Sequence, residues 1–417
     1  MFEEYTLKNG ARIILAPHDT ASTTTLVTYP VGSRYEPEHL RGVSHYIEHI
    51  MFKGTQKRKS AFELTRAIDR LGAEYNAYTG KEETGYYIKA DSSFLDTSMD
   101  ILSDMLFNSV FDAKEMEKEK GPVIEELKMY RDNPLMNIDN VFEETLFALP
   151  LGGDEGGTDK HVASFKRPDV LAYRDKYYDP GSMIIIVTGM IPASIRALID
   201  SYFGSHKKKV KPSHSFKAAA LNANKKTDRI CVQEKKVDQT QLMMGFPAFA
   251  HDHKDMSILS VMNIILGGSM SSRLFVKIRE QLGLAYVVRS GHEHFRDAGY
   301  VYASAGLDAK NVNKAIAVIA KEFEKLCTTL VGKQELADAK THLRGALTLS
   351  MENSSNQAEW YAKEALFHKT IETPEQYLVE TDKVTREDIM RVAKQLFKMN
   401  QLRVAVIGDI QSKNVVF

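Results

Sequence analysis

The chain has 417 residues, of which 43% are hydrophobic and 26% charged, the composition of a folded globular protein. Its 55 basic residues equal its 55 acidic residues, so the charge indicates neither nucleic acid nor a membrane surface as a partner. Cys231 and Cys327 are too few for a disulfide framework, and we expect no targeting segment and no membrane span. These features predict a cytoplasmic protein of about two domains.

The N-terminal region predicts β-strands. Residues 5–7 and 12–16 flank Asn9-Gly10, a pair typical of a tight hairpin turn. Residues 23–29 form a further β-rich run. We therefore expect a sheet to begin before residue 30.

The next segment contains the pattern His45-x-x-Glu48-His49 inside a run that is apolar at Val43, Ile47 and Ile50. This spacing predicts a helix with one buried face. On a helix, His45 and His49 project from the same face one turn apart and can bind one zinc ion. Glu48 would lie beside the metal, where it could take a proton from a water molecule.

The remaining elements of the first half mix helices and strands. Helices are predicted at 60–71, with Ser60 as N-cap, and at 91–107, 113–130 and 170–178; strands are predicted at 74–79, 84–90 and 183–189. Around residues 205–226 lysines, alanines and a Lys-Pro pair crowd together, which indicates a linker.

The second half repeats the first. The segment 26–30 resembles 243–247, and 85–90 resembles 299–304. We therefore predict an α+β protein of two homologous α/β-sandwich domains, 1–210 with the metal ligands and 227–417 without them, joined by a linker at 211–226. In this register Met262 and Leu266 stand where His45 and His49 stand in the first half, so the fold itself does not need the histidines.

A catalytic zinc ion needs a third protein ligand. The predicted helix 113–130 offers several carboxylates, among them Glu119, Glu125 and Glu126. Glu119 and Glu126 are seven residues apart and share a face, but the residue types alone do not choose between Glu125 and Glu126.

Together, His45-x-x-Glu48-His49, Glu119 and Glu126 resemble the pitrilysin-type zinc metallopeptidases, or inverzincins. The length and the duplication resemble the branch that contains the mitochondrial processing peptidases and their bacterial relatives. The resemblance implies one zinc ion per chain, held by His45, His49 and Glu126, with Glu48 as general base and Glu119 as a supporting acid near the metal. The family spacing selects Glu126 over Glu125.

The resemblance extends to less specific segments. Asn76-Ala77-Tyr-Thr79 resembles the family's active-site edge strand, which implies substrate-binding roles for Asn76 and Ala77. Arg279 and Tyr286 resemble an arginine that contacts the substrate backbone and a tyrosine that stabilises the oxyanion. From composition alone, Arg279 would be an ordinary surface arginine and Tyr286 a half-buried tyrosine.

The sequence therefore predicts a zinc endopeptidase that cleaves peptides or unfolded protein segments. We expect a clamshell homodimer, with Arg279 and Tyr286 acting across the dimer, or alternatively a heterodimer with a non-catalytic paralogue. A non-catalytic structural or peptide-binding subunit of the same fold is the alternative function.

Overall fold

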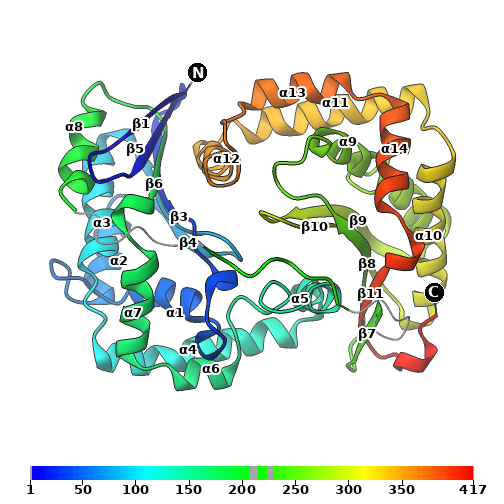
Figure 1. The fold of residues 1–417 in the computed structure, drawn as a ribbon, viewed down its shortest axis with the longest axis horizontal. Helices are drawn as coiled ribbons and strands as arrows, with labels where there is room; N and C mark the ends of the chain where they lie inside the picture. The colour runs from blue at the N-terminus through cyan, green and yellow to red at the C-terminus, as the bar shows by residue number, and fades with distance from the viewer. Residues whose placement is uncertain (1, 207–214, 223–228, 417) are drawn as a thin grey trace. The chain divides into compact units, whose positions relative to one another are not determined.

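The computed structural model describes residues 2–206, 215–222 and 229–416. They form two compact units, each built around one mixed β-sheet with helices packed on both faces (Figure 1). Unit 1 comprises residues 1–128, 154–217 and 349–371, and unit 2 comprises residues 129–153, 218–348 and 372–417. Each unit therefore takes most of its residues from one half of the chain and one segment from the other.

The sheet of unit 1 has the strand order β1-β2-β6-β3-β5-β4, in which only β2 and β6 pair in parallel. Its strands are β1 (Glu3–Thr6), β2 (Arg12–Pro17), β3 (Ser22–Tyr29), β4 (Glu74–Thr79), β5 (Thr84–Asp91) and β6 (Ile184–Gly189). The central strand β6 is buried along its whole length, as expected for a strand covered on both faces. Strand β4 lies at the edge of the sheet.

The helices of unit 1 form two layers. On one face, alternate strand residues such as Val27 and Ile185 pack in a large apolar core with helices from the first half of the chain. On the other face, Leu26 and Ile186 pack against α12 (Ser354–Phe367). The first-half helices are α1 (Val43–Met51), α2 (Ala61–Asp69), α3 (Leu95–Asn108), α4 (Ala113–Asp132), α6 (Asp159–Ser164), α7 (Arg167–Tyr177) and α8 (Ile195–Ile199), which continues into the π-helix η5 (Asp200–Gly204).

The sheet of unit 2 has the order β7-β11-β8-β10-β9, with β7 and β11 parallel. Its strands are β7 (Ile230–Glu234), β8 (Thr240–Ala248), β9 (Ala285–His294), β10 (Gly299–Leu307) and β11 (Arg403–Gly408). The helices of this unit are α5 (Pro134–Leu146), α9 (Met256–Leu266), the π-helix η7 (Phe275–Gln281), α10 (Val312–Thr328), α11 (Lys333–Ser350), α13 (Pro374–Lys383) and α14 (Arg386–Leu396). Across both units, no described helix has the length and apolar character needed to cross a membrane.

The two sheets show the predicted duplication directly. Strands β2, β6, β3, β5 and β4 have the same order and directions as β7, β11, β8, β10 and β9. In the predicted register, Met262 and Leu266 lie in α9 and are fully buried, so this position is occupied by core residues in the second repeat.

The repeats exchange one segment each. Helix α5, from the first half, packs on β8 and β11 of unit 2, and α12, from the second half, packs on β3 and β6 of unit 1. The predicted domains, 1–210 and 227–417, correspond to the two sequence repeats. The compact units differ from these domains because α5 and α12 each cover the sheet of the other repeat. Within the predicted linker, residues 211–214 and 223–226 lie outside the described residues.

Candidate metal centre and active site

Helix α1 carries the HxxEH residues and begins after Gly42, which has a φ of 89°. Glycine adopts this left-handed conformation at little cost, and a Cβ here would lie 2.1 Å from the carbonyl oxygen of Gly156. The free N–H groups of the first turn are capped by Glu36, whose carboxylate accepts from Gly42 at 2.6 Å and from Ser44 at 2.8 Å. The start of α1 is therefore fixed by its surroundings.

Three side chains from α1 and α4 converge on one point. The Nε2 atoms of His45 and His49 lie 3.3 Å apart. Glu126 Oε2 lies 3.1 Å from His49 Nε2 and 3.7 Å from His45 Nε2. Tetrahedral zinc, with bonds of about 2.0–2.2 Å, places neighbouring ligand atoms roughly 3.3–3.6 Å apart. This triangle therefore has the dimensions of a zinc site.

The hydrogen bonds of His49 identify the ring nitrogen that faces this site. His49 Nδ1 lies 3.0 Å from Glu119 Oε1 and donates to it, because an ionised carboxylate can only accept. In the neutral ring, Nε2 then carries a lone pair directed at the carboxylate oxygen of Glu126. Two acceptors at 3.1 Å repel each other unless a proton on Nε2 or a metal cation lies between them. The donor set of two imidazoles and a carboxylate fits zinc.

The protonation states agree with a cation site. Burial lowers the pKa of His49, but the hydrogen bonds with Glu119 and Glu126 outweigh burial and raise that pKa to about 9. Burial, followed by the charge of His49, lowers the pKa of His45, and the hydrogen bond with His49 lowers the pKa of Glu126. A metal ion would therefore displace one proton, on His49, while His45 and Glu126 are already in their ligating forms.

Glu48 is held by the neighbouring edge strand. Its Oε2 accepts a hydrogen bond of 2.5 Å from Oγ1 of Thr79, the last residue of β4. Burial raises the pKa of Glu48 above its ordinary value, opposed by the Thr79 hydrogen bond and the charge of His49. A half-buried carboxylate with a raised pKa is suited to accepting a proton and releasing it again.

Glu119 and Glu125 have different surroundings. Glu119 is buried, and its second oxygen, Oε2, pairs with Lys53 Nζ at 2.7 Å. Glu125 has a side chain that is 73% exposed and pairs with Lys128 at 2.8 Å. Between the two carboxylates that the residue types left open, Glu126 joins the histidines and Glu125 pairs on the helix surface.

The predicted substrate-binding pair lies on the edge strand. Ala77 is buried and Asn76 is exposed, and Asn76 Oδ1 accepts from the backbone N–H of Ala77 at 3.0 Å. Helix α1 packs against this strand, and Phe52, which caps α1, lies with its ring centroid 6.3 Å from that of Tyr75. Strand β4 therefore packs directly against α1, the helix that carries His45 and His49.

Arg279 and Tyr286 lie in unit 2. Arg279 is in η7, and its Cζ lies 4.7 Å from the ring centroid of Tyr286, at the start of edge strand β9. Tyr286 is 72% exposed. The sequence expectation of a half-buried tyrosine is therefore wrong, because an edge strand exposes this side chain. The two residues form a cation–π pair in the second repeat.

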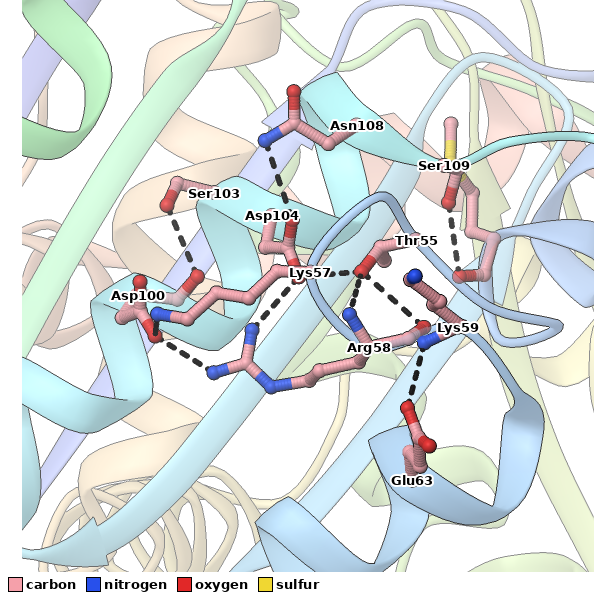
Figure 2. Close-up of polar contacts among 11 residues, drawn as sticks. Thr55, Lys57, Arg58, Lys59, Glu63, Asp100, Ser103, Asp104, Asn108 and Ser109 are labelled. Atoms are coloured by element: carbon pink, nitrogen blue, oxygen red, sulfur yellow. Dashed lines mark hydrogen bonds and ion pairs between the residues drawn. The ribbon is translucent and has the colours of Figure 1, made fainter.

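The chain segment after α1 is fastened to α3 by a polar network (Figure 2). Arg58 donates to Asp100 at 2.6 Å and to Asp104 at 2.8 Å, and Thr55 donates to Asp104 at 2.5 Å. Ser109 donates to the carbonyl oxygen of Met51, the last residue of α1, at 3.2 Å. These contacts hold the C-terminal end of the helix that carries His45 and His49.

Three residues for which the sequence analysis predicted no individual role support the site: Lys53, Thr79 and Glu36. Lys53 follows His49 by four residues, just beyond the C-cap of α1 at Phe52, and a four-residue spacing could have signalled a contact. Thr79 shares a strand face with Ala77, which points toward α1 by alternation alone. Glu36 precedes α1 in an irregular segment, and no local pattern in the sequence marks it as a helix cap.

Within the described residues, a mixed α/β fold is duplicated along the chain and a His-His-Glu cluster that could hold a metal ion lies on the first repeat alone, the arrangement of a two-domain metallopeptidase fold. Residues 12–154 match the family model described as insulinase (peptidase family M16), and residues 164–343 match the peptidase M16 inactive domain. The chain belongs to this family, the M16 or pitrilysin family of peptidases. The predicted family and the predicted fold of two homologous units are thereby confirmed.

Relatives cover nearly the whole chain. An uncharacterized zinc protease of Bacillus subtilis (strain 168), YmxG, is 34% identical over 399 residues, 95% of this chain and 96% of the relative. An uncharacterized zinc protease of Rickettsia felis is 32% identical over 402 residues, 94% of each chain. A protease from Helicobacter pylori has a similar solved structure, with a TM-score of 0.90 at 24% identity over 98% of this chain and 99% of that one. The last comparison shows the fold alone.

Proposed function

We propose that the chain is a zinc-dependent endopeptidase that hydrolyses peptides or unfolded protein segments. His45, His49 and Glu126 would hold one zinc ion, which supplies a Lewis acid that lowers the pKa of water and polarises a peptide carbonyl. Glu48 takes a proton from the attacking water and later gives it to the leaving amine. Glu119 keeps His49 in the tautomer that presents Nε2.

The observation that carries this proposal is the triangle of Nε2, Nε2 and Oε2 atoms with edges of 3.1–3.7 Å. Its two histidines lie on the same helix as Glu48, a half-buried carboxylate with a raised pKa. The relatives in Bacillus subtilis and Rickettsia felis are named as zinc proteases, which supports the same activity.

The substrate would bind as an additional strand. Strand β4 ends one side of its sheet, and α1 packs against it. A peptide that pairs with β4 would be aligned by backbone hydrogen bonds around Asn76 and Ala77. Recognition through the backbone predicts loose sequence selectivity.

The test compares wild type with Glu48→Gln on a fluorogenic unstructured peptide, with zinc measured in both. We expect Glu48→Gln to retain zinc and to lose at least about a hundredfold in kcat, because a carboxamide cannot accept the proton. Equal cleavage by the two proteins would show that Glu48 is not the general base. Stoichiometric zinc with no cleavage by wild type would favour the alternative, a peptide-binding subunit of the same fold.

We also propose that two copies form a homodimer in which Arg279 and Tyr286 of one copy serve the zinc site of the other. The exposure of Tyr286 and its pairing with Arg279 at 4.7 Å leave the ring edge and hydroxyl accessible to a partner. Mixing Glu48→Gln chains with Tyr286→Phe chains should restore activity. Two inactive stocks that remain inactive after subunit exchange would favour action within one chain, or a heterodimer with a non-catalytic paralogue.

We propose the cytoplasm as the compartment. Cys231 and Cys327 are free thiols and both are half-buried. A reducing compartment maintains thiols in this state. Peptides and unfolded segments released there would be the available substrates.

A further inference from the structure

The hydrogen-bond pattern of the β4–β5 hairpin shows which backbone groups face the open edge. Strands β4 and β5 are antiparallel, with Thr79 opposite Thr84 and Ala77 opposite Tyr86. Beyond them, the N–H of Gly80 donates to the carbonyl oxygen of Glu83 at 2.8 Å, which makes this a hydrogen-bonded pair. Such pairs alternate with non-bonded pairs along an antiparallel ladder. The N–H and C=O of Thr79 and Ala77 therefore point away from β5.

Two further hydrogen bonds agree with this assignment. The N–H of Ala77 donates to the side chain of Asn76. The carbonyl oxygen of Thr84 accepts from Thr28 Oγ1 on the opposite neighbour, β3, at 3.3 Å. An incoming peptide strand would therefore pair with the backbone of Ala77 and Thr79.

Thr79 links the open edge of β4 to Glu48. Its backbone faces the open edge, and its hydroxyl donates to Glu48 Oε2 at 2.5 Å. Glu48 is half-buried, and this hydrogen bond fixes one of its carboxylate oxygens, Oε2, and does not involve the other, Oε1. A strand that pairs with Thr79 restrains its backbone, and through it the hydroxyl that orients Glu48.

We propose that Thr79 is a positioning residue that couples an extended peptide bound on β4 to the orientation of Glu48. This inference rests on the proposed peptidase function and deepens it. Binding along the edge strand would place the proton acceptor as well as the scissile bond. Peptides that pair with the end of β4 would be cleaved faster than equally well-bound peptides that stop short of it.

The experiment measures kcat, KM and zinc content for wild type, Thr79→Val and Thr79→Ser on one extended peptide. Valine preserves the shape and strand propensity of threonine but removes the hydroxyl. We expect Thr79→Val to lose roughly 10- to 100-fold in kcat, with KM changed less than about twofold and zinc content unchanged, because a misplaced acceptor slows the proton transfer. Thr79→Ser should restore most of kcat.

The matched control is Thr28→Val, which removes a strand hydroxyl of the same sheet that donates to the carbonyl oxygen of Thr84 instead. We expect it to cleave like wild type. An unchanged kcat in Thr79→Val, a change in KM alone, or loss of zinc would overturn the coupling role. In those cases cleavage by wild type and its loss in Glu48→Gln would still uphold the peptidase function. No cleavage by zinc-loaded wild type would overturn both.

Discussion

Lys53 lies at the end of a chain of contacts that leads to the metal ligands. Its Nζ pairs with Glu119 Oε2 at 2.7 Å, and Glu119 Oε1 binds His49 Nδ1 at 3.0 Å. Burial raises the pKa of Glu119, but the hydrogen bonds with His49 and Lys53 outweigh it and lower that pKa below its ordinary value. Lys53 therefore helps to keep Glu119 ionised, and an ionised Glu119 holds the ring of His49.

Removing the charge of Lys53 should weaken zinc binding. We expect Lys53→Met to lower the zinc affinity about 10- to 100-fold, the usual effect of disturbing an outer partner of a metal ligand, because Lys53 keeps Glu119 ionised and Glu119 is that partner of His49. Competition with a chromophoric chelator measures this affinity without any substrate.

The matched control is Lys57→Met, which removes a lysine paired with Asp100 away from the histidines. We expect its zinc affinity to equal that of wild type, and Lys53→Arg to recover most of the loss. Equal affinities in Lys53→Met and Lys57→Met would show that the outer contact does not tune the site.

The sequence predicted the residues whose geometry is local. His45 and His49 share a helix face at a spacing of four, so their convergence follows from the helix alone. The choice of Glu126 over Glu125 required the family resemblance, because the two residues are adjacent in the sequence and only the packing of α4 on α1 decides which one faces the histidines. Thr79 reaches Glu48 from a strand 31 residues away. Such a contact depends on tertiary packing, which no local pattern encodes.

At the level of elements, the first turn of α1 depends on a cap from outside the helix. Glu36 is buried and accepts from Gly42 and Ser44. Burial raises its pKa from 4.5 to about 7, although the backbone hydrogen bonds oppose this shift. The folded chain therefore retains a proton on Glu36 that the unfolded chain has already released between these two pH values.

This raised pKa gives a pH dependence with a defined sign. The stability contributed by protonated Glu36 is fully present below pH 4.5 and is lost as the pH rises through about 7. Thermal unfolding of wild type and Glu36→Gln between pH 5 and pH 8.5 tests this. We expect the Tm of wild type to fall relative to that of the variant, which cannot titrate. Parallel Tm curves for the two proteins would contradict the raised pKa.

A helix begins where the sequence predicts it when the sequence contains a clear N-cap residue. Ser60 accepts from the N–H of Glu63 and starts α2, as its position predicted. The predicted helix 91–107 instead begins with a 3-10 turn, η3 (Ser92–Phe94), before α3, because Asp91 caps that turn. Helix α5 was not predicted, and its apolar face turns toward the sheet of the other repeat.

At the level of the whole molecule, the exchange of α5 and α12 makes each unit depend on both halves of the chain. Ala362 of α12 is fully buried in a core with Ile14, Leu26 and Ile186 of unit 1. The repeat pattern predicted the duplication but not this exchange, because similarity between segments does not say which sheet a helix covers.

A charge placed in this core should therefore destabilise the unit that holds the metal ligands. We expect Ala362→Glu to lower the free energy of unfolding by about 3 kcal/mol or more, since it buries an unpaired carboxylate. Hydrogen exchange should speed up first in β2, β3 and β6.

Lys363→Glu introduces the same residue on the exposed side of α12 and serves as the control. We expect wild-type exchange in that variant. Faster exchange confined to the strands of unit 2 in Ala362→Glu would contradict the assignment of α12 to unit 1.

The reciprocal exchange also sets the order in which the protein can mature on the ribosome. All six strands of the first sheet are synthesised by residue 189, but the helix that covers their second face begins only at Ser354. During the intervening synthesis, Ile14, Leu26 and Ile186 have no permanent cover, so the nascent chain carries an apolar surface. The half that carries His45, His49 and Glu126 is therefore made first, but the core around its sheet is completed only when most of the chain has been synthesised.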